Sequence, residues 1–209
     1  FIEKAVEGID NIVKRTGLKY ELVIVDDGSI DDTRTKVTNY ANNNGHVKVI
    51  GYNRNMGKGF AIKTGFLQCR GDAIVFADSD SDIDLGQITG YLETLKTADM
   101  VIASKWHPKS RVEMPLLRRL LSYSFNTLVR LLTGIRATDT QTGLKAVKRN
   151  ALEKAFRTLA VKKYAFDVEL LVLANLYGLK VVELPVTIRM HSLFSFRDMW
   201  RMFLDLLGI

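Results

Sequence analysis

Four aspartates stand at alternate positions directly after an apolar run in the middle of the chain. The apolar run is residues 73–77, and the acids that follow it are Asp78, Asp80, Asp82 and Asp84. An apolar run of that length predicts a buried strand, so the carboxylates should lie at its carboxyl end. In an extended chain alternate side chains point to one side, where like charges repel unless a cation intervenes. Because hard oxygen ligands suit Mg²⁺ or Mn²⁺, the pattern predicts a divalent cation here.

A second acidic pair, Asp26 and Asp27, follows the apolar run 22–25, and Gly28 then supplies a turn. Ligands of open α/β sheets bind outside the carboxyl ends of the strands, so two acidic strand ends favour a nucleotide and metal site. Helix capping explains the acids further along this turn, but it does not explain the pair on the strand end. A carboxylate there can accept a hydrogen bond from the N–H of a uracil or guanine edge.

The stretch from Asn53 to Phe60 is rich in glycine, contains Lys58 and opens a helix. Backbone N–H groups at a helix N-terminus bind phosphate. The stretch is not a Walker A loop, because Tyr52 replaces the first glycine and Gly59 replaces Ser/Thr. A glycine turn with a solvated lysine is an equally good interpretation of these residues alone.

Three other features have ordinary structural explanations when each is taken alone. Residues 139–145 are polar and lie between two helical patterns, which is typical of a loop. Asp167 stands near the start of a helix, where the helix dipole favours an acid. The three histidines show no metal-ligand spacing and are interpreted as surface or packing residues: His46, His107 and His191.

Strands and helices alternate along the chain, which predicts an α/β fold with a mostly parallel central sheet flanked by helices. The predicted strands are residues 22–25, 47–50, 73–77, 100–103 and 180–184. The predicted helices are residues 2–17, 31–44, 57–69, 85–95, 115–132, 151–156 and 168–177. This order places both acidic strand ends on one edge of the sheet.

The chain of 209 residues carries a net charge of +7, which favours polyanionic partners such as nucleic acid, anionic lipid or phosphorylated ligands. Between Lys105 and Arg136 seven basic residues face a single acid, Glu113. One cysteine, Cys69, excludes an intrachain disulfide, and a reducing cytoplasmic setting is the simplest interpretation. No apolar run approaches a membrane span, and no signal peptide is visible. Both ends interrupt a helical pattern, so we expect a longer protein.

Residues 191–209 form an amphipathic pattern of a different kind. A narrow polar stripe of Arg197, Asp198, Arg201 and Asp205 is surrounded by apolar residues that include Trp200. An apolar arc this wide predicts a helix lying in a membrane interface, with tryptophan and arginine at the level of the headgroups. The alternative is a helix that packs against a further part of the protein or a partner chain.

Five stretches together resemble the family 2 glycosyltransferases, specifically the polyprenyl-phosphate (dolichyl-phosphate) glucose and mannose synthases. They are residues 25–29, 53–65, 78–80, 139–145 and 166–171, in the order that the family has them. The resemblance implies a GT-A type nucleotide-diphospho-sugar transferase fold over residues 1–190, whose usual first strand would precede this chain. Residues 191–209 would be the membrane-interface helix.

The resemblance also implies roles for individual residues. Asp26 and Asp27 would lie at the base and ribose of the nucleotide. The implied nucleotide-sugar site is Asp26, Asp27, Gly28, Asn55, Gly57, Lys58 and Asp78. The implied metal ligands are Asp78, Asp80 and Asp82, which leaves Asp84 as the N-cap of the next helix. The implied acceptor-phosphate site is Arg118, Arg119, Ser122 and Arg136. The implied catalytic residues are Asp80, Arg118, Arg119, Asp139 and Gln141.

The implied reaction is the inverting, metal-dependent transfer of a hexose from UDP-glucose or GDP-mannose to a polyprenyl or dolichyl monophosphate. It would take place on a membrane surface with the active site facing the cytoplasm and without nucleic acid. Three alternatives remain at this stage: a family 2 enzyme with a glycan or other non-lipid acceptor, a nucleotidyltransferase that makes a sugar nucleotide, and a non-catalytic binding module. Crowded carboxylates argue against the last, since binding alone rarely needs them.

Overall fold

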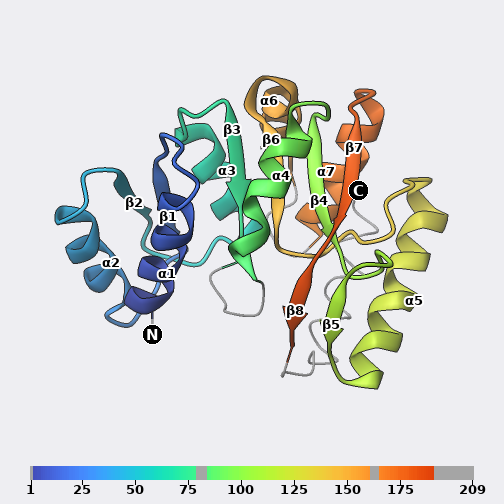
Figure 1. The fold of residues 1–209 in the computed structure, drawn as a ribbon, viewed down its shortest axis with the longest axis horizontal. Helices are drawn as coiled ribbons and strands as arrows, with labels where there is room; N and C mark the ends of the chain where they lie inside the picture. The colour runs from blue at the N-terminus through green and yellow to red at the C-terminus, as the bar shows by residue number, and fades with distance from the viewer. Residues whose placement is uncertain (1, 79–83, 161–164, 191–209) are drawn as a thin grey trace.

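In the computed structural model, which describes residues 2–78, 84–160 and 165–190, helices and strands alternate along the chain (Figure 1). The helices are α1 (Ile2–Lys14), α2 (Thr33–Asn42), α3 (Lys58–Gln68), the 3₁₀ helix η1 (Leu85–Gln87), α4 (Ile88–Leu95), α5 (Leu116–Thr133), α6 (Arg149–Thr158) and α7 (Phe166–Leu176). The strands are β1 (Leu22–Asp26), β2 (Val47–Gly51), β3 (Ala73–Phe76), β4 (Met100–Ser104), β5 (Arg111–Glu113), β6 (Lys145–Lys148), β7 (Val181–Pro185) and β8 (Thr187–Arg189). Each predicted helix and strand is present within a few residues of its expected bounds, and Asp84 caps η1 as expected.

A mixed four-stranded sheet with the order β3-β6-β4-β7 forms the centre of the molecule (Figure 1). β4 and β7 are parallel, whereas β6 runs antiparallel to both β3 and β4, so the central sheet is mixed rather than mostly parallel as the sequence pattern predicted. The sequence pattern did not predict β6, because its two apolar residues are flanked by Lys145 and Lys148. β6 matters for the site because it brings the preceding loop, residues 139–144, to the carboxyl end of β3.

Helices cover both faces of this sheet, and β4 shows how its residues divide between them. Met100 and Ile102 belong to the core beneath α6 and α7, whereas Val101 and Ala103 belong to the core beneath α4. Alternate side chains of a strand point to opposite faces, so a strand that is covered on both sides is apolar throughout. The fully buried pattern of β4 follows from this arrangement.

β1 and β2 form a separate parallel pair at one end of the molecule, together with α1 and α2 (Figure 1). Within the described ranges no strand pairing joins β1 to β3. α3 connects the two sheets instead. Its glycine Gly65 lies so close to β1 that an added Cβ would come within 3.2 Å of Val25 Cγ2. α3 therefore positions the carboxyl end of β1 relative to that of β3.

A third sheet consists of the short parallel strands β5 and β8 below the central sheet (Figure 1). The pairing continues where the Met190 N–H donates to the Glu113 carbonyl at 2.8 Å. The start of α5 and the last described residue therefore lie at the same end of the molecule. None of the helices within the described ranges has the length and apolar content needed to cross a membrane.

Candidate active site

Asp78, at the carboxyl end of β3, lies next to Lys58, the first residue of α3. The Lys58 Nζ is 2.9 Å from Asp78 Oδ1 and 3.6 Å from Asp167 Oδ2 in the first turn of α7. The Lys58 side chain is only 26% exposed, so the solvated-lysine interpretation is wrong. Burial alone would lower the pKa of Lys58, but the carboxylates of Asp167 and Asp78 outweigh it and raise that pKa. Lys58 is therefore a fixed cation at the strand end.

Asp167 joins Lys58 to a second lysine, Lys145, at the start of β6. The Lys145 Nζ donates to Asp167 Oδ1 at 2.7 Å and to the Thr142 carbonyl at 2.7 Å. Both side chains are almost completely buried. Burial would raise the pKa of Asp167, yet Lys145 and Lys58 lower it below the ordinary value. The Asp167 carboxylate therefore links two lysines, which is a larger role than the helix-dipole interpretation gave it.

Asp139 is the centre of an adjoining buried network. It accepts hydrogen bonds from the Lys105 N–H at 2.8 Å, the Lys105 Nζ at 2.9 Å and the Thr142 hydroxyl at 2.5 Å. Burial would raise its pKa, but the charge and hydrogen bonds of Lys105 hold the pKa below its ordinary value. Since Asp139 is 0% exposed, the geometry suits it to positioning the loop rather than to touching a substrate. Its predicted catalytic role stays a prediction.

The loop of residues 139–144 also packs directly on Asp78. A Cβ on Gly143 would overlap the Asp78 carboxylate, so glycine is the residue type that allows this approach. Gln141 is half-buried, and its N–H donates to Asp139 Oδ1 at 3.2 Å. The loop therefore fixes the carboxylate of Asp78, while Lys58 holds it from another side.

At the end of β1, Asp26 and Asp27 are bound by groups of the protein. Asp26 Oδ2 lies 2.6 Å from the Arg34 Nε, and Asp26 Oδ1 accepts from the Ser29 N–H. Burial would raise the pKa of Asp26, but these partners lower it. Asp27 accepts the N–H groups of Met56 at 2.7 Å and Gly57 at 3.0 Å.

These contacts join the turn after β1 to the glycine-rich loop after β2. Gly28 has a φ of +75° and lies against the backbone of Arg54 and Asn55, where a side chain would collide. Asn55 itself is exposed, and Gly57 is buried with a φ of +98°. The predicted nucleotide contacts of these residues stay predictions, but the structure does bring the two loops together.

α5 carries three of the four predicted acceptor-phosphate residues. Arg118 and Ser122, four residues apart, lie on the half-buried side of the helix, and Asn126 continues that side one turn later. Asn126 Oδ1 accepts from the Thr140 N–H at 3.0 Å and from its hydroxyl at 2.8 Å, which fastens α5 to the loop of residues 139–144. Arg119 lies on the exposed side of the helix. Arg136, in the loop after α5, is also exposed.

Two predicted metal ligands, Asp80 and Asp82, and the segment 191–209 lie outside the described residues. Within the described ranges no group of three or more His, Cys, Asp or Glu side chains forms a metal site. Of the three predicted metal ligands, only Asp78 belongs to the described residues, and the metal site stays a prediction. Among the histidines, His46 packs against Asp10, which agrees with a packing role.

Three polar residues that organise the site were not predicted from the sequence. Lys105 directly follows the fully buried strand β4, and a lysine at such a strand end signals a buried partner. Glu183 of β7 accepts from the N–H groups of Thr138 and Asp139. Arg34 holds Asp26, but nothing in its sequence context in α2 indicates that contact.

Comparison with known proteins gives consistent matches. The glycosyl transferase family 2 model matches residues 2–156. The dolichyl-phosphate beta-glucosyltransferase of Saccharomyces cerevisiae is 33% identical over 202 residues, covering 87% of this chain and 60% of that protein. The Homo sapiens protein of the same name is 37% identical over 180 residues, covering 80% and 55%. The chain thus spans a little over half the length of these relatives.

Solved structures of glucosyl-3-phosphoglycerate synthase from Mycobacterium tuberculosis share the fold. One, in complex with Mn²⁺, uridine diphosphate and phosphoglyceric acid, matches with a TM-score of 0.71 at 19% identity, covering 99% of this chain and 72% of that chain. Another, in complex with Mn²⁺ and UDP-glucose, matches with a TM-score of 0.68 at 22% identity, covering 100% and 74%. These likenesses confirm the expected GT-A type fold. Together with the family match, they establish that the chain belongs to glycosyltransferase family 2.

Proposed function

We propose that the protein transfers glucose, with inversion, from UDP-glucose to a dolichyl or related polyprenyl monophosphate at a membrane surface that faces the cytoplasm. The observation that carries this proposal is one continuous polar network. It begins at Asp78, whose side chain is 33% exposed, and passes through Lys58, Asp167 and Lys145 to Thr142. The neighbouring Thr140 is bonded to Asn126 of α5, which supports a site shared by the donor end and the acceptor helix.

The donor set at the end of β3 fits a divalent cation. Asp78 offers a partly exposed carboxylate, and Asp80 and Asp82 follow it at alternate positions. Hard oxygen ligands of this kind suit Mg²⁺ or Mn²⁺. When bound, such a cation neutralises the charge of a diphosphate leaving group. Lys58 places a second positive charge beside Asp78, and it would bind the same diphosphate.

On the acceptor side, Arg118 and Ser122 would hold the lipid phosphate. A guanidinium matches phosphate geometry, and its charge lets two anionic substrates approach each other. The acceptor phosphate is already ionised at neutral pH, so the transfer needs no strong general base. This agrees with the state of Asp139 and Asp167, which are both occupied by lysines rather than available as proton acceptors.

The relatives favour glucose over mannose as the sugar. The proteins from Saccharomyces cerevisiae and Homo sapiens are named as dolichyl-phosphate beta-glucosyltransferases, and one structural neighbour was solved with UDP-glucose. We therefore expect UDP-glucose to be used in preference to GDP-mannose. The sequence identities of 33% and 37% to these two proteins support this choice of donor.

The test is transfer of labelled glucose from UDP-glucose to dolichyl phosphate, with Mn²⁺ or Mg²⁺ and with a chelator. Asp78→Asn should abolish transfer, whereas Asp72→Asn, on an exposed residue just before the same strand, should leave it unchanged. Transfer that persists in Asp78→Asn, or in chelator, would refute the donor site. GDP-mannose replaces UDP-glucose in a parallel reaction, and preferential use of it would overturn the choice of sugar.

The second candidate keeps the fold and replaces the lipid by a glycan or another non-lipid acceptor. It is favoured by the structural neighbour that was solved in complex with phosphoglyceric acid, which is not a lipid. A screen of dolichyl phosphate against water-soluble glycans and small phosphates separates the two. Arg118→Ala should reduce the use of a phosphate acceptor far more than the binding of UDP-glucose, and equal losses would contradict the acceptor assignment.

A further inference from the structure

The outer side of α5 exposes a row of large apolar side chains. Leu116 is 82% exposed, Leu120 63%, Tyr123 60% and Leu131 78%. Their spacing of three, four and eight residues places them on one stripe of the helix, and Leu117 and Leu132 flank it at 57% each. Single exposed apolar residues are ordinary, but a contiguous patch on one helix indicates an interaction surface.

The opposite side of α5 is already packed against the protein. Val129 is completely buried, Asn126 is bonded to Thr140, and Phe125 and Leu128 pack against the core beneath α6 and α7. The helix is therefore held in place without its outer leucines. Figure 1 shows α5 at the edge of the molecule, at the end opposite α1 and α2, so the patch faces outward.

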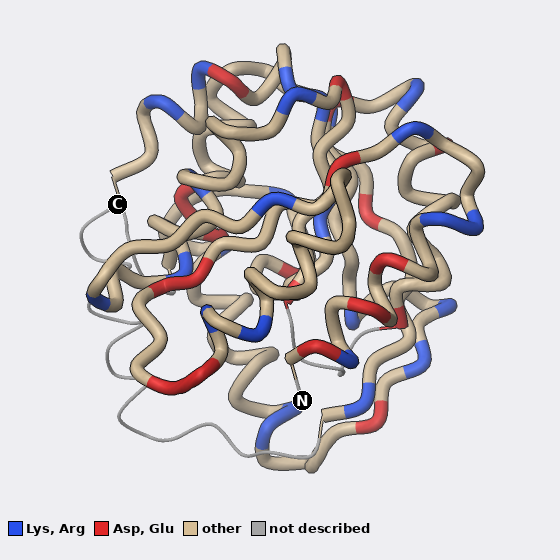
Figure 2. Tube along the Cα trace, turned by 90° about the vertical axis from the view of Figure 1, so that its left-hand side faces the viewer, with Lys and Arg blue, Asp and Glu red and all other residues tan. Residues whose placement is uncertain are grey.

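The charge of α5 indicates what kind of surface the patch fits. The helix contains three arginines and no acidic residue. Arg119 and Arg130 are both exposed, and because they stand eleven residues apart they lie on one flank of the leucine stripe. Around α1 and α2, by contrast, acidic and basic segments are interspersed (Figure 2).

A second copy of the chain is a poor partner for this patch, because pairing two α5 helices would bring their arginines together. An anionic lipid surface satisfies both properties at once: leucine and tyrosine enter the interfacial layer while arginine binds headgroup phosphate. We infer that α5 lies along an anionic membrane surface, with Arg119 and Arg130 on the headgroups. This inference rests on the proposed function, since a lipid phosphate would be delivered to Arg118 and Ser122 on the inner side of the same helix.

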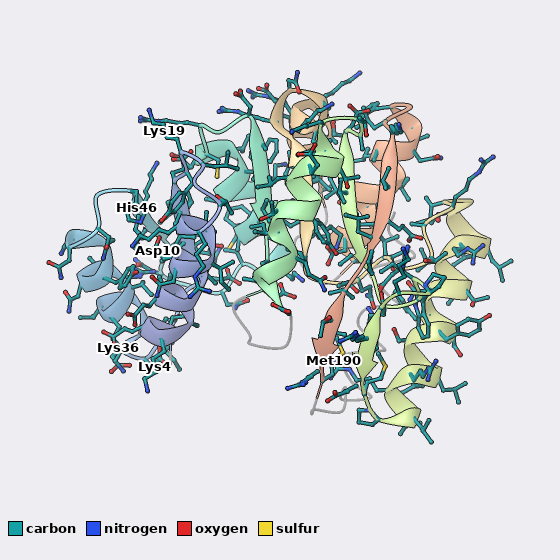
Figure 3. The ribbon with its side chains drawn as sticks, in the orientation of Figure 1. Lys4, Asp10, Lys19, Lys36, His46 and Met190 are labelled. Carbon is teal, nitrogen blue, oxygen red and sulfur yellow. The ribbon has the colours of Figure 1, made fainter. Side chains whose placement is uncertain are left out.

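The position of Met190 agrees with this orientation. Figure 3 shows Met190 at the end of β8, and its N–H is bonded to Glu113, three residues before α5 begins. The segment 191–209, whose sequence predicts a membrane-interface helix, thus continues from beside the start of α5.

The experiment places an environment-sensitive fluorophore on each end of the full chain. In a Cys69→Ser background, NBD is attached through Leu131→Cys on the α5 patch or through Ile30→Cys, a fully exposed position before α2. Vesicles of phosphatidylcholine alone or with phosphatidylserine are then added. We expect the emission at position 131 to shift to the blue with anionic vesicles, while the emission at position 30 stays unchanged.

Each other outcome overturns the inference. An unchanged signal at position 131, while the protein sediments with the vesicles, would mean that another surface binds lipid. A blue shift without vesicles that grows with protein concentration would mean that a second copy of the chain covers the patch. A blue shift without vesicles that does not depend on protein concentration would mean that residues 191–209 cover it.

A second measurement separates this inference from the proposed function. Leu116→Ser/Leu120→Ser/Leu131→Ser changes exposed residues only and should weaken partition into anionic vesicles roughly tenfold. The variant should glucosylate a short-chain, water-soluble polyprenyl phosphate at the wild-type rate but lose transfer to dolichyl phosphate in vesicles. Equal loss with both acceptors would refute the docking role. If the wild-type protein glucosylates neither acceptor, the proposed function fails. The fluorophore measurement would still show whether α5 contacts the membrane.

Discussion

Two aspartates, Asp10 and Asp167, are buried in different parts of the molecule, and their partners differ in kind. Asp10 of α1 accepts from the hydroxyls of Tyr20 at 2.6 Å and Tyr40 at 2.9 Å, and its Oδ1 is 2.7 Å from His46 Nε2. The Lys14 Nζ lies 2.8 Å from its other oxygen. Figure 3 shows Asp10 and His46 together at the end formed by α1 and α2.

Asp167, by contrast, is bound by two ammonium groups, and one of them continues to a carboxylate that solvent can reach. The Asp10 cluster is closed, because its donors end on one carboxylate and tie α1 to α2 and the strands beside it. We call the Asp167 cluster open, because Lys58 pairs with Asp167 and also with Asp78, a partly exposed carboxylate at the strand end. The two clusters use a buried carboxylate differently: Asp10 gathers donors onto one carboxylate, whereas Asp167 links two lysines, one of which also pairs with a second, partly exposed carboxylate.

The largest expected effect is the loss of Asp167. Asp167→Ala leaves the ammonium of Lys145 buried without its carboxylate, which should lower the free energy of unfolding by about 3–5 kcal/mol. Urea denaturation followed by circular dichroism measures it. The control is Glu153→Ala, which removes an exposed pair with Arg157 and should change the free energy of unfolding far less, because solvent screens that pair. A similar small cost at Asp167 would show that the open cluster is not held by this pair.

Gly143→Ala tests the open end of that cluster. The new methyl group would overlap Asp78 and displace its carboxylate, and a misplacement of this size can cost about a hundredfold in kcat. Gly90→Ala, on α4 where an added Cβ meets nothing within 4 Å, is the matched control and should leave kcat unchanged. Measured kcat values for glucosyl transfer that are equal in the two variants would contradict the role given to the close packing of Gly143 on Asp78.

Asp10→Asn tests the closed cluster. An amide cannot accept all the hydrogen bonds that the carboxylate accepts, so the free energy of unfolding should fall by about 2 kcal/mol. The affinity for UDP-glucose should not change, because the partners of Asp10 among the described residues are Tyr20, Tyr40, His46 and Lys14, and none of them belongs to the Asp78–Lys58–Asp167 network. Calorimetric titration and urea denaturation of the same samples give both quantities. Weaker UDP-glucose binding at full stability would make the Asp10 cluster a functional one.

The smallest expected effect is a pH dependence of the closed cluster. Burial would raise the pKa of Asp10, but its hydrogen bonds lower it well below 3.8, so its stabilisation is present above that value and is lost as pH falls. Burial and the hydrogen bond to Asp10 raise the pKa of Tyr40 from 10.0 to about 12. Its contribution is therefore full below pH 10 and is lost as pH rises toward 12.

Tyr40→Phe isolates the alkaline half of this effect. The difference in unfolding free energy between wild type and variant should shrink by roughly 1 kcal/mol between pH 9 and pH 12, after allowance for solvent screening. Urea denaturation at a series of pH values measures the difference. A constant difference over that range would mean that the hydroxyl of Tyr40 contributes nothing through its ionisation.

Apolar runs and their order predicted most of the fold, because β1 to β4 are encoded by local residue patterns. β6 escaped prediction for a physical reason: Lys145 is a buried cation whose partner, Asp167, lies in a later helix. A pairing between distant residues leaves no periodic signal near either of them. The same reason explains why Lys58 looked like a solvated side chain and why Lys105 was missed.

The candidate site was predictable as a set of motifs but not as an arrangement. The predicted motifs after β3, before β6 and at the start of α7 do meet, and α5 joins them through Asn126. The sequence did not indicate which side of α5 faces the protein. In the structure Arg118 and Ser122 lie on the inner side of this helix and Arg119 lies on the outer side. The two sides of α5 are distinguished only by the tertiary packing of the helix against the rest of the protein.

The separation of β1 and β2 from the central sheet has a consequence for hydrogen exchange. A two-stranded pair is marginal by itself, so the lobe of α1, β1, α2 and β2 depends on α3 and on the Asp10 cluster for its protection. Its amides should exchange through a partial opening of lower free energy than the global unfolding that exposes β4 and β7. The residues predicted to bind the nucleotide, Asp26 and Asp27, lie in this lobe, which should open first. A bound nucleotide should therefore slow exchange there more than anywhere else.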